Sequence, residues 1–349
     1  MKNKKKLYSI LIFIYLIPVF TFAQNYKQIE NDLQQGLITY DEAILHKFYL
    51  GFGSKNIFPN YSNATEKQYR KCGTDLIVEY YKNKSKLSSN SIKEIESLIS
   101  KDNLFKTTAQ IYTSPSSKFE LTYETSGINS VPTKDSNLNS VPDYVENIAD
   151  YFDYTWKKLI DTMGYLPPPI GSGKYKVSFQ NMEYYGYTNV DGSNTKSTYI
   201  VLHNNFIGFP ANDDPDGDQL GAAKVTAFHE FKHAIQIMYN YWNDPSWFLE
   251  MDATWAEDIG FDDVNDYYNY LSESHIKQPG RSFETGSGYE DCLWMHHLSQ
   301  SFGNKINKDI WQRRQLNGFE NIYQCFNNIL LNYSSTFNTS LTKYLHGIF

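Results

Sequence analysis

The pentapeptide His-Glu-Phe-Lys-His at residues 229–233 is the feature of this chain that points most directly to chemistry. It lies in a run of helical apolar spacing from Val225 to Met238, so one helical turn separates the two histidines. Both imidazoles then project from the same face of the helix. Imidazoles at this spacing can bind one zinc ion, and Glu230 beside them is a candidate base. The spacing predicts a zinc metallopeptidase.

A catalytic zinc usually takes a third protein ligand and leaves its fourth position for water. Glu250 is the candidate in the segment that follows. The motif helix is expected to end near Tyr239, and Asp244 followed by Pro245 is typical of an N-cap with proline at the first helical position. If the two helices form an antiparallel hairpin, Glu250 lies level with His233.

Glu257 lies two turns beyond Glu250 on the same helical face, level with the turn that carries His229. We expect it to orient a ligand through a hydrogen bond, and it is the reserve candidate for the third ligand. Gln236 and Tyr239 stand where the longer motif with a third histidine would need glycine and histidine, which excludes that arrangement.

The chain resembles the gluzincin metallopeptidases and, more closely, a family of secreted bacterial metalloproteases. That resemblance implies a zinc site made by His229, His233 and Glu250, with Glu230 as the catalytic base. Lys232 departs from the pattern, since a bulky apolar residue is expected there, but it lies off the ligand face. The resemblance covers most of residues 110–300 and depends on Ser114-Pro115-Ser116, Thr125-Ser126-Gly127, Asp135 to Glu146, Tyr185-Gly186-Tyr187-Thr188, Thr226 to Phe231 and Trp247 to Asp258.

Gluzincins usually place a tyrosine or histidine from a later segment over the scissile carbonyl. Tyr289, ahead of an expected helix from Asp291 to Ser301, is therefore a candidate donor to the oxyanion. His296 and His297 compete for that role, although each is more often a surface or satisfied core residue.

A second metal signal is the segment from Asp135 to Glu146, whose oxygen donors have the spacing of a calcium loop. Ser140 occupies the position that favours glycine, and a polar turn leading into a helix is the alternative. A further acidic loop at 213–218 is expected to be a solvated turn, and the alternative is a second calcium site. The expected Ca2+ donors are Asp135, Asn137, Asn139, the Val141 carbonyl, Asp143 and Glu146.

Three parts of the chain are expected: a signal peptide at 1–23, a helical segment at 24–105 and a metallopeptidase domain at 106–349. Thr39 and Ser91 each begin a capping-box pattern, with Glu42 and Glu94 three residues later. The helical segment is either a propeptide that shields the zinc or a permanent subdomain, and the sequence identifies no cleavage site between them.

Strands are expected before the motif helix and helices after it. Apolar residues alternate around Phe119 to Tyr123 and Tyr175 to Phe179, and Tyr199 to Leu202 is a short apolar run typical of a buried strand. A helix with one apolar face lies between the first two strands. This order predicts an α+β, gluzincin-like domain: a twisted sheet with the active-site helix, then a mainly helical second lobe. An edge strand near Tyr185 to Thr188 is expected to pair with an extended substrate.

The first residues combine four lysines, an apolar stretch and small residues before Gln24, which predicts a secretory signal peptide cleaved near Ala23. Removing those lysines changes the formal net charge from −7 to about −11, which argues against nucleic acid or an anionic membrane surface as a partner. We expect no membrane anchor and a monomer. Three cysteines are too few for a disulfide framework and are expected to be buried as small apolar residues: Cys72, Cys292 and Cys325.

Together these features predict a secreted Zn2+-dependent endopeptidase that hydrolyses polypeptides, with Glu230 as general base. Two other classes stay open. One is a secreted binding or adhesion protein that retains the peptidase fold, and the other is a zinc hydrolase acting on a non-peptide ester or amide.

Overall fold

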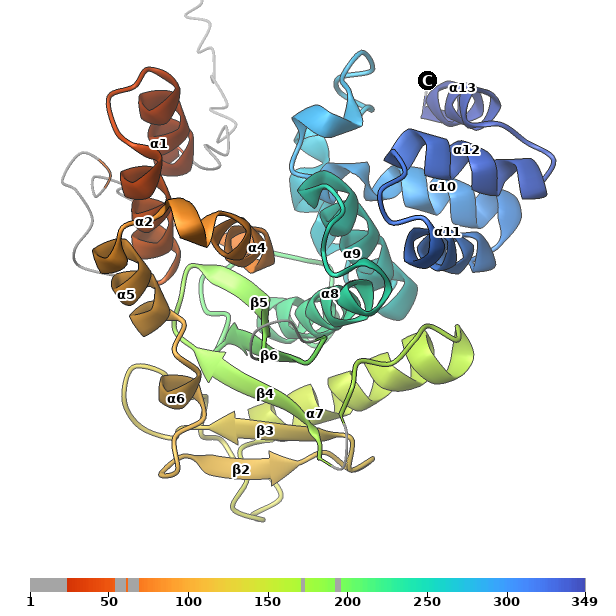
Figure 1. Ribbon diagram of the computed structural model, residues 1–349. Helices are drawn as coiled ribbons and strands as arrows, with labels where there is room; N and C mark the ends of the chain where they lie inside the picture. Colours follow the sequence, from red (N-terminus) through yellow and green to blue (C-terminus); the bar gives the residue numbers. More distant parts are fainter. Residues whose placement is uncertain (1–23, 54–60, 62–68, 171–172, 192–195, 349) are drawn as a thin grey trace, which may run out of the picture.

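A six-stranded mixed sheet with helices on both faces forms the centre of the molecule (Figure 1). The computed structural model describes residues 24–53, 61, 69–170, 173–191 and 196–348. This architecture confirms the predicted α+β class. The predicted signal peptide at 1–23 lies outside the described residues.

The sheet has the strand order β1-β5-β6-β4-β3-β2. β5 and β6 are antiparallel, as are β2 and β3, whereas β1 is parallel to β5 and β4 is parallel to both β3 and β6. The three strands expected around Phe119, Tyr175 and Tyr199 are confirmed. The bounds are β1 Arg70–Cys72, β2 Gln110–Thr113, β3 Phe119–Tyr123, β4 Tyr175–Gln180, β5 Tyr184–Val190 and β6 Thr198–His203.

Helices α7 (Asp143–Trp156) and α8 (Asp218–Asn240) pack on one face of the sheet, and α7 continues into a π-helical turn at Lys157–Thr162. α8 carries the predicted zinc motif and approaches β5 closely at Gly186. A Cβ atom on Gly186 would lie 2.7 Å from Thr226 Cγ2 and 3.0 Å from Glu230 Cγ. Glycine therefore lets the motif helix sit directly against the sheet.

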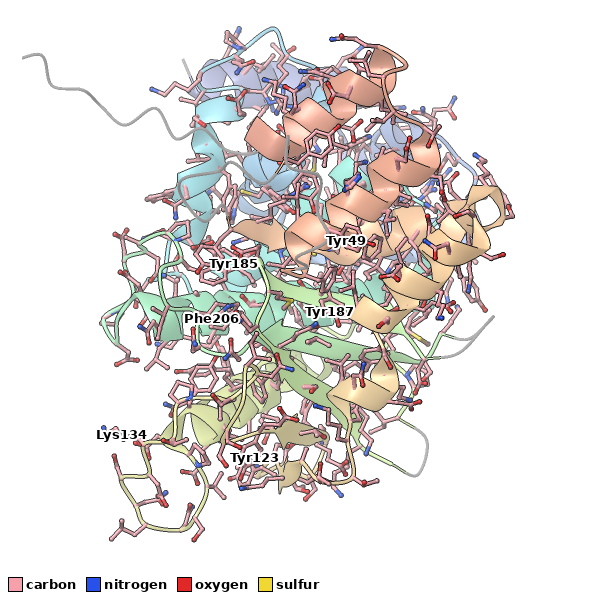
Figure 2. The ribbon with its side chains drawn as sticks, turned by 90° about the vertical axis from the view of Figure 1, so that its left-hand side faces the viewer. Tyr49, Tyr123, Lys134, Tyr185, Tyr187 and Phe206 are labelled. Carbon is pink, nitrogen blue, oxygen red and sulfur yellow. The ribbon has the colours of Figure 1, made fainter. Side chains whose placement is uncertain are left out.

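The other face, over β5 and β6, is covered by the N-terminal segment, which faces the viewer in Figure 2. Its helices share an apolar cluster with Tyr184, Tyr187, Tyr199 and Val201 of the sheet. The helices are α1 (Gln24–Gln34), α2 (Tyr40–Gly51), α4 (Thr74–Asn83), α5 (Ser89–Leu98) and α6 (Lys101–Leu104), with a 3-10 turn at Lys84–Lys86.

Of the two capping boxes predicted in this segment, one is confirmed and the other is wrong. Thr39 and Glu42 form the predicted capping box at the start of α2. The second capping box is wrong, because Ser88 is the N-cap of α5 and accepts from the backbone N–H of Ser91. Ser91 instead lies inside the helix and donates its hydroxyl to Asp41.

β1 makes the N-terminal segment a part of the sheet, although that segment was expected to be helical throughout. It pairs with β5 on the side away from β6. The prediction of an open edge near Tyr185 to Thr188 is therefore wrong, because β1 already occupies that edge.

After α8 the chain is helical, as predicted for the second lobe (Figure 1). Pro245 itself is the N-cap of α9, one position later than the expected Asp244. Among the described residues, no helix is long and apolar enough to cross a membrane. The elements are α9 (Ser246–Gly260), 3-10 turns at Asp266–Glu273, Phe283–Thr285 and Tyr289–Asp291, and then α10 (Cys292–Phe302), α11 (Lys305–Leu316), α12 (Ile322–Asn332) and α13 (Phe337–Ile348).

Candidate metal centre

The hairpin of α8 and α9 brings His229, His233 and Glu250 together in the interior. His229 Nε2 lies 3.1 Å from His233 Nε2 and 3.0 Å from Glu250 Oε2, and His233 Nε2 lies 3.5 Å from Glu250 Oε1. Ligands about 2.0–2.3 Å from a tetrahedral zinc would be roughly 3.3 to 3.8 Å from one another. The three side chains are thus spaced close to what one zinc ion requires.

Cys72 completes this group from the end of β1, and the sequence did not predict it. Its Sγ lies 3.4 Å from His233 Nε2, and one ligand atom from each of Cys72, His229, His233 and Glu250 lies within 4.8 Å of the others. We call these four residues the metal cluster; all are buried. The other two cysteines are buried in the apolar core, as expected.

Hydrogen bonds at the far ring nitrogens hold both imidazoles with Nε2 pointing inward. Glu257 Oε1 lies 2.6 Å from His229 Nδ1, so Glu257 is level with His229, as the hairpin register predicted. Gln236 Oε1 lies 2.7 Å from His233 Nδ1, and its amide nitrogen donates to the Leu249 carbonyl at 2.9 Å. Such contacts fix the tautomer and ring orientation of a ligating histidine.

The cluster strongly favours bound positive charge. Burial disfavours the charged form of His229, but the carboxylates of Glu250 and Glu257 outweigh it and raise the pKa of His229 to about 10. Burial also opposes the charge of Glu250, but the neighbouring histidines His233 and His229 lower the pKa of Glu250 to about 2. A divalent cation in this position would replace the protons that the two imidazoles otherwise attract.

Glu230 lies on the β5 side of α8 with its carboxylate buried. Its Oε2 accepts hydrogen bonds from Thr74 Oγ1 at 3.0 Å and from Thr188 Oγ1 at 2.8 Å. Its Oε1 is buried without a hydrogen-bond partner in the protein. A buried carboxylate oxygen without a donor is costly unless another molecule supplies one, so Oε1 is available to a water molecule.

Of the three candidates for an oxyanion donor, the structure places Tyr289 beside the cluster. Its ring lies 6.1 Å from the ring of His229. Burial and the charge of Glu250 raise the pKa of Tyr289 well above its ordinary value, so its hydroxyl keeps a proton to donate. His296 instead lies 3.6 Å from Asp258 and stacks on Tyr267, and His297 packs on Trp294 and Tyr344.

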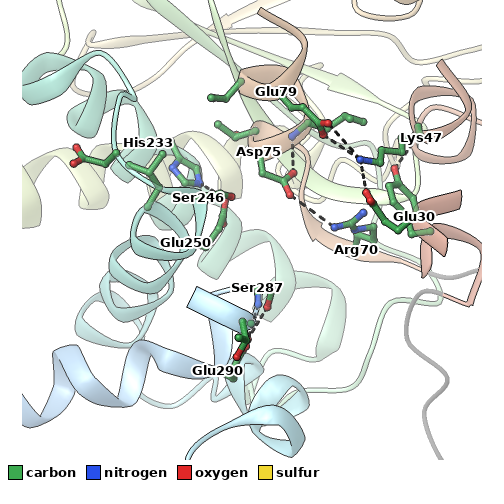
Figure 3. Close-up of a pocket in the computed structure, with 18 of the residues that line it drawn as sticks. Glu30, Lys47, Arg70, Asp75, Glu79, His233, Ser246, Glu250, Ser287 and Glu290 are labelled. Carbon is green, nitrogen blue, oxygen red and sulfur yellow. Dashed lines mark hydrogen bonds and ion pairs between the residues drawn. The ribbon is translucent and has the colours of Figure 1, made fainter. Parts of the chain in front are cut away.

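A cleft of about 840 Å³ reaches the metal cluster between the N-terminal segment and the C-terminal lobe (Figure 3). His233 and Glu250 lie on one wall, and Arg70 and Asp75 lie on the opposite wall. Charged residues of both signs line it, so the cleft has polar partners for an extended chain.

The predicted calcium loop is folded around its own carboxylates. Glu146 accepts from the side-chain amides of Asn137 at 2.9 Å and Asn139 at 2.7 Å. Asp135 accepts from the backbone N–H groups of Asn139 at 3.3 Å and Ser140 at 2.8 Å. Asp143 begins α7 and accepts from Ser136 N at 2.7 Å.

Ser140 has φ 71°, the positive value that the calcium-loop pattern expects at this position. The Val141 amide donates to Asn139 Oδ1 at 2.8 Å. The loop follows Lys134, which Figure 2 shows on a loop extending from the body of the molecule. Its hydrogen bonds are compatible with a capped polar turn, and calcium binding stays a prediction.

The acidic loop before α8 carries its own cation. Lys224 Nζ lies 2.9 Å from Asp214 Oδ2 and 2.7 Å from Asp216 Oδ2, and Asp214 is buried. Asp218 begins α8 and accepts from the Asn212 backbone, and Asp213 accepts from Asn265. The turn interpretation accounts for these contacts without a metal.

Lys232, where the resemblance predicted a bulky apolar residue, is completely buried. Its Nζ lies 3.3 Å from Asp252 Oδ2 and 3.5 Å from the centre of the Tyr165 ring. A lysine is accommodated here because α9 supplies a buried carboxylate and the neighbouring rings supply π faces.

Comparison with protein-family models, with curated proteins and with solved structures found no match to this chain.

Proposed function

We propose that this chain is a secreted zinc-dependent endopeptidase of the gluzincin type, with Glu230 as its general base. The observation that supports it best is the convergence of His229, His233 and Glu250 beside a buried carboxylate oxygen that has no donor. Two imidazoles and one carboxylate are a common protein ligand set for catalytic zinc.

His229, His233 and Glu250 would hold the metal. A zinc ion bound there would supply a Lewis acid and lower the pKa of bound water. Glu230 Oε1 would accept the proton of the attacking water, while Thr188 and Thr74 fix the other carboxylate oxygen. The protonated Glu230 would then deliver that proton to the leaving amine.

Tyr289 would donate its hydroxyl proton in a hydrogen bond to the oxygen that becomes negative in the transition state. Its burial beside the cluster supports that role, because a donor in a low-dielectric site stabilises developing charge more strongly than one in water. Polypeptides are the proposed substrates, and the cleft lined by charges of both signs supports an extended, polar substrate.

One observation favours a second candidate function. With Cys72 as a fourth ligand the site would be closed, as in structural zinc sites, and the chain would then be a secreted binding protein that retains the fold. A non-peptide zinc hydrolase remains the third class.

Metal analysis and hydrolysis of unfolded casein test the proposal, using the chain without its predicted signal peptide and also its Cys72→Ser variant. We expect one zinc per chain and chelator-sensitive hydrolysis in at least the variant. Adding Glu230→Gln to either chain should retain the zinc and lower hydrolysis at least about a hundredfold, because the base is lost and the ligands stay.

Glu120→Gln is the matched control, because Glu120 lies on β3, pairs with Lys176 and is outside the lining of the cleft. If the Glu230→Gln chain hydrolyses casein as fast as its parent, Glu230 is not the base and the proposal is wrong.

A further inference from the structure

One short stretch of the N-terminal segment contacts both the proposed metal ligands and the proposed base. In residues 70–75, Cys72 Sγ lies 3.4 Å from His233 Nε2, and Thr74 Oγ1 donates to Glu230 Oε2 at 3.0 Å. The same hydroxyl accepts from the Thr188 backbone N–H at 2.8 Å. Metal ligands, base and sheet are thus all engaged by this stretch.

The stretch also occupies the backbone edge that an extended peptide could use. Arg70 N–H donates to the Glu183 carbonyl at 2.7 Å, and Gly73 N–H donates to the Gly186 carbonyl at 2.9 Å. Addition of a strand to an open sheet edge is a common way to bind a peptide. With β1 in place, a substrate cannot pair with Tyr184 to Gly186 on this side of β5.

Cys72 differs from the other two buried cysteines in its surroundings. Cys292 and Cys325 belong to the main apolar core, whereas Cys72 faces a ring nitrogen of His233. Thiolate sulfur is a strong zinc ligand, and a thiol that binds zinc releases its proton to solvent.

We propose that Cys72 is the fourth ligand of the zinc site and that residues 70–75 hold the peptidase in a latent state. The inference rests on the proposed function. Cys72 takes the coordination position that water needs, and β1 covers the sheet edge at Tyr184 to Gly186. Hydrolysis requires the Cys72 bond to the metal to break, so that water enters in its place.

Neighbouring contacts fix the stretch firmly. Lys71 is buried and lies 2.9 Å from Glu257 Oε2, and it also pairs with Asp266. Arg70 lies 3.9 Å above the Tyr26 ring and 3.8 Å from Asp75. Because displacing Lys71 would leave two buried carboxylates without their cation, these contacts hold Cys72 in place beside the metal cluster.

X-ray absorption at the zinc edge tests the ligand directly. We expect one sulfur and three nitrogen or oxygen neighbours in the natural chain, and loss of the sulfur in Cys72→Ser. Cys292→Ser is the matched control, since it removes an equally buried cysteine from the apolar core and should keep the sulfur signal.

Thiol alkylation of the natural chain gives a second measurement that does not depend on a variant folding. Iodoacetamide should modify Cys72 slowly in the zinc-loaded chain and faster after a chelator removes the metal, as mass spectrometry of its peptides would show. Cys325 is buried in the core and should react equally slowly in both states.

Casein hydrolysis then tests latency. We expect Cys72→Ser to hydrolyse casein at least tenfold faster than the natural chain. A tenfold difference corresponds to a preference of about 1.4 kcal/mol for the thiolate over water as the fourth ligand. Thr74→Val removes the hydroxyl on Glu230 but keeps Cys72, so it should retain the sulfur signal.

Two results would overturn the inference: zinc without a sulfur neighbour, or equal hydrolysis by the natural chain and Cys72→Ser. Loss of zinc from Cys72→Ser while Cys292→Ser keeps it would support Cys72 as a ligand but make that ligand structural, which overturns the latent state. Chelator-sensitive hydrolysis that depends on Glu230 but not on Cys72 would refute the latent state and still support the proposed function. A sulfur ligand without hydrolysis by any variant would instead refute the peptidase.

Discussion

Helices α8 and α9 bury two polar clusters between them, and the two differ in how their charges are balanced. In the metal cluster, imidazole nitrogens, a carboxylate and a thiol point at one another. In the second, which we call the lysine cluster, Asp252 Oδ2 lies 3.3 Å from Lys232 Nζ and accepts from Gln236 and Trp311 at 2.9 Å each.

Gln236 connects the two clusters, because its carbonyl oxygen contacts His233 and its amide nitrogen donates to Asp252. The lysine cluster has a cation of its own, and Asp252 Oδ2 accepts two hydrogen bonds, whereas Asp252 Oδ1 is buried without a hydrogen-bond partner among the described residues. The metal cluster brings several electron-pair donors to one point, which is stable only with a shared proton or a cation between them. Convergence of electron-pair donors, more than burial of charge, therefore distinguishes the site of the proposed function.

The largest expected effect is on the metal cluster itself. Glu250→Ala removes the only carboxylate among the proposed zinc ligands and should strip zinc from the chain. Glu257→Ala should lower zinc affinity only about ten- to a hundredfold, because Glu257 acts through His229. Zinc titration against a competing chelator measures both. The reverse order of the two variants would make Glu257 the ligand.

In the lysine cluster, Lys232→Met should lower the free energy of unfolding by about 3–5 kcal/mol, since it leaves Asp252 buried without its cation. Zinc content should not change. Denaturant unfolding measures the loss, and the double variant Lys232→Met with Asp252→Asn should recover part of it. If Lys232→Met alone also removed zinc, the two clusters would not be independent.

The sequence predicted the parts of this arrangement that are encoded locally. Helical periodicity around His229 and the proline before α9 were enough to predict a hairpin, and the hairpin placed Glu250 and Glu257 at the heights where the structure has them. Spacing along a helix translates directly into position, so such predictions need no knowledge of the rest of the fold.

The contributions of the N-terminal segment could not be predicted in this way. β1 has three residues, too few to show the alternation that identifies a strand, and it pairs with a strand more than a hundred residues later. Cys72 lies 161 positions from His233, and no spacing rule connects them. An odd number of cysteines in a chain expected to be secreted was the one available signal.

The calcium loop offers a third, exposed case, in which amide and backbone N–H groups satisfy most of the carboxylate oxygens and Lys134 lies 3.7 Å from Asp143. If it binds calcium, saturation at a hundredfold excess over Kd should stabilise the native state by about 2.7 kcal/mol. The melting temperature should then rise with calcium at constant zinc, and Asp135→Ala should abolish the rise. Melting that is indifferent to millimolar calcium would reduce the loop to the hydrogen-bonded turn that Glu146 and Asp143 already make.

The smallest expected effect is a change of stability with pH, which compares how burial and ion pairing act on the pKa of Lys232. Burial disfavours the charged form of Lys232 more than Asp252 favours it, which lowers the pKa of Lys232 from 10.5 to about 8. Between these values the unfolded chain binds more protons at this residue than the folded chain, so its contribution to stability rises with pH, by at most about 1.4 kcal/mol per pH unit. The stability difference between the natural chain and Lys232→Met should therefore widen from about pH 8 to about pH 9.5, a range below the ordinary tyrosine pKa. Urea unfolding of both proteins across that range measures it. A constant difference would mean that Asp252 keeps Lys232 charged, with the folded pKa at or above its ordinary value.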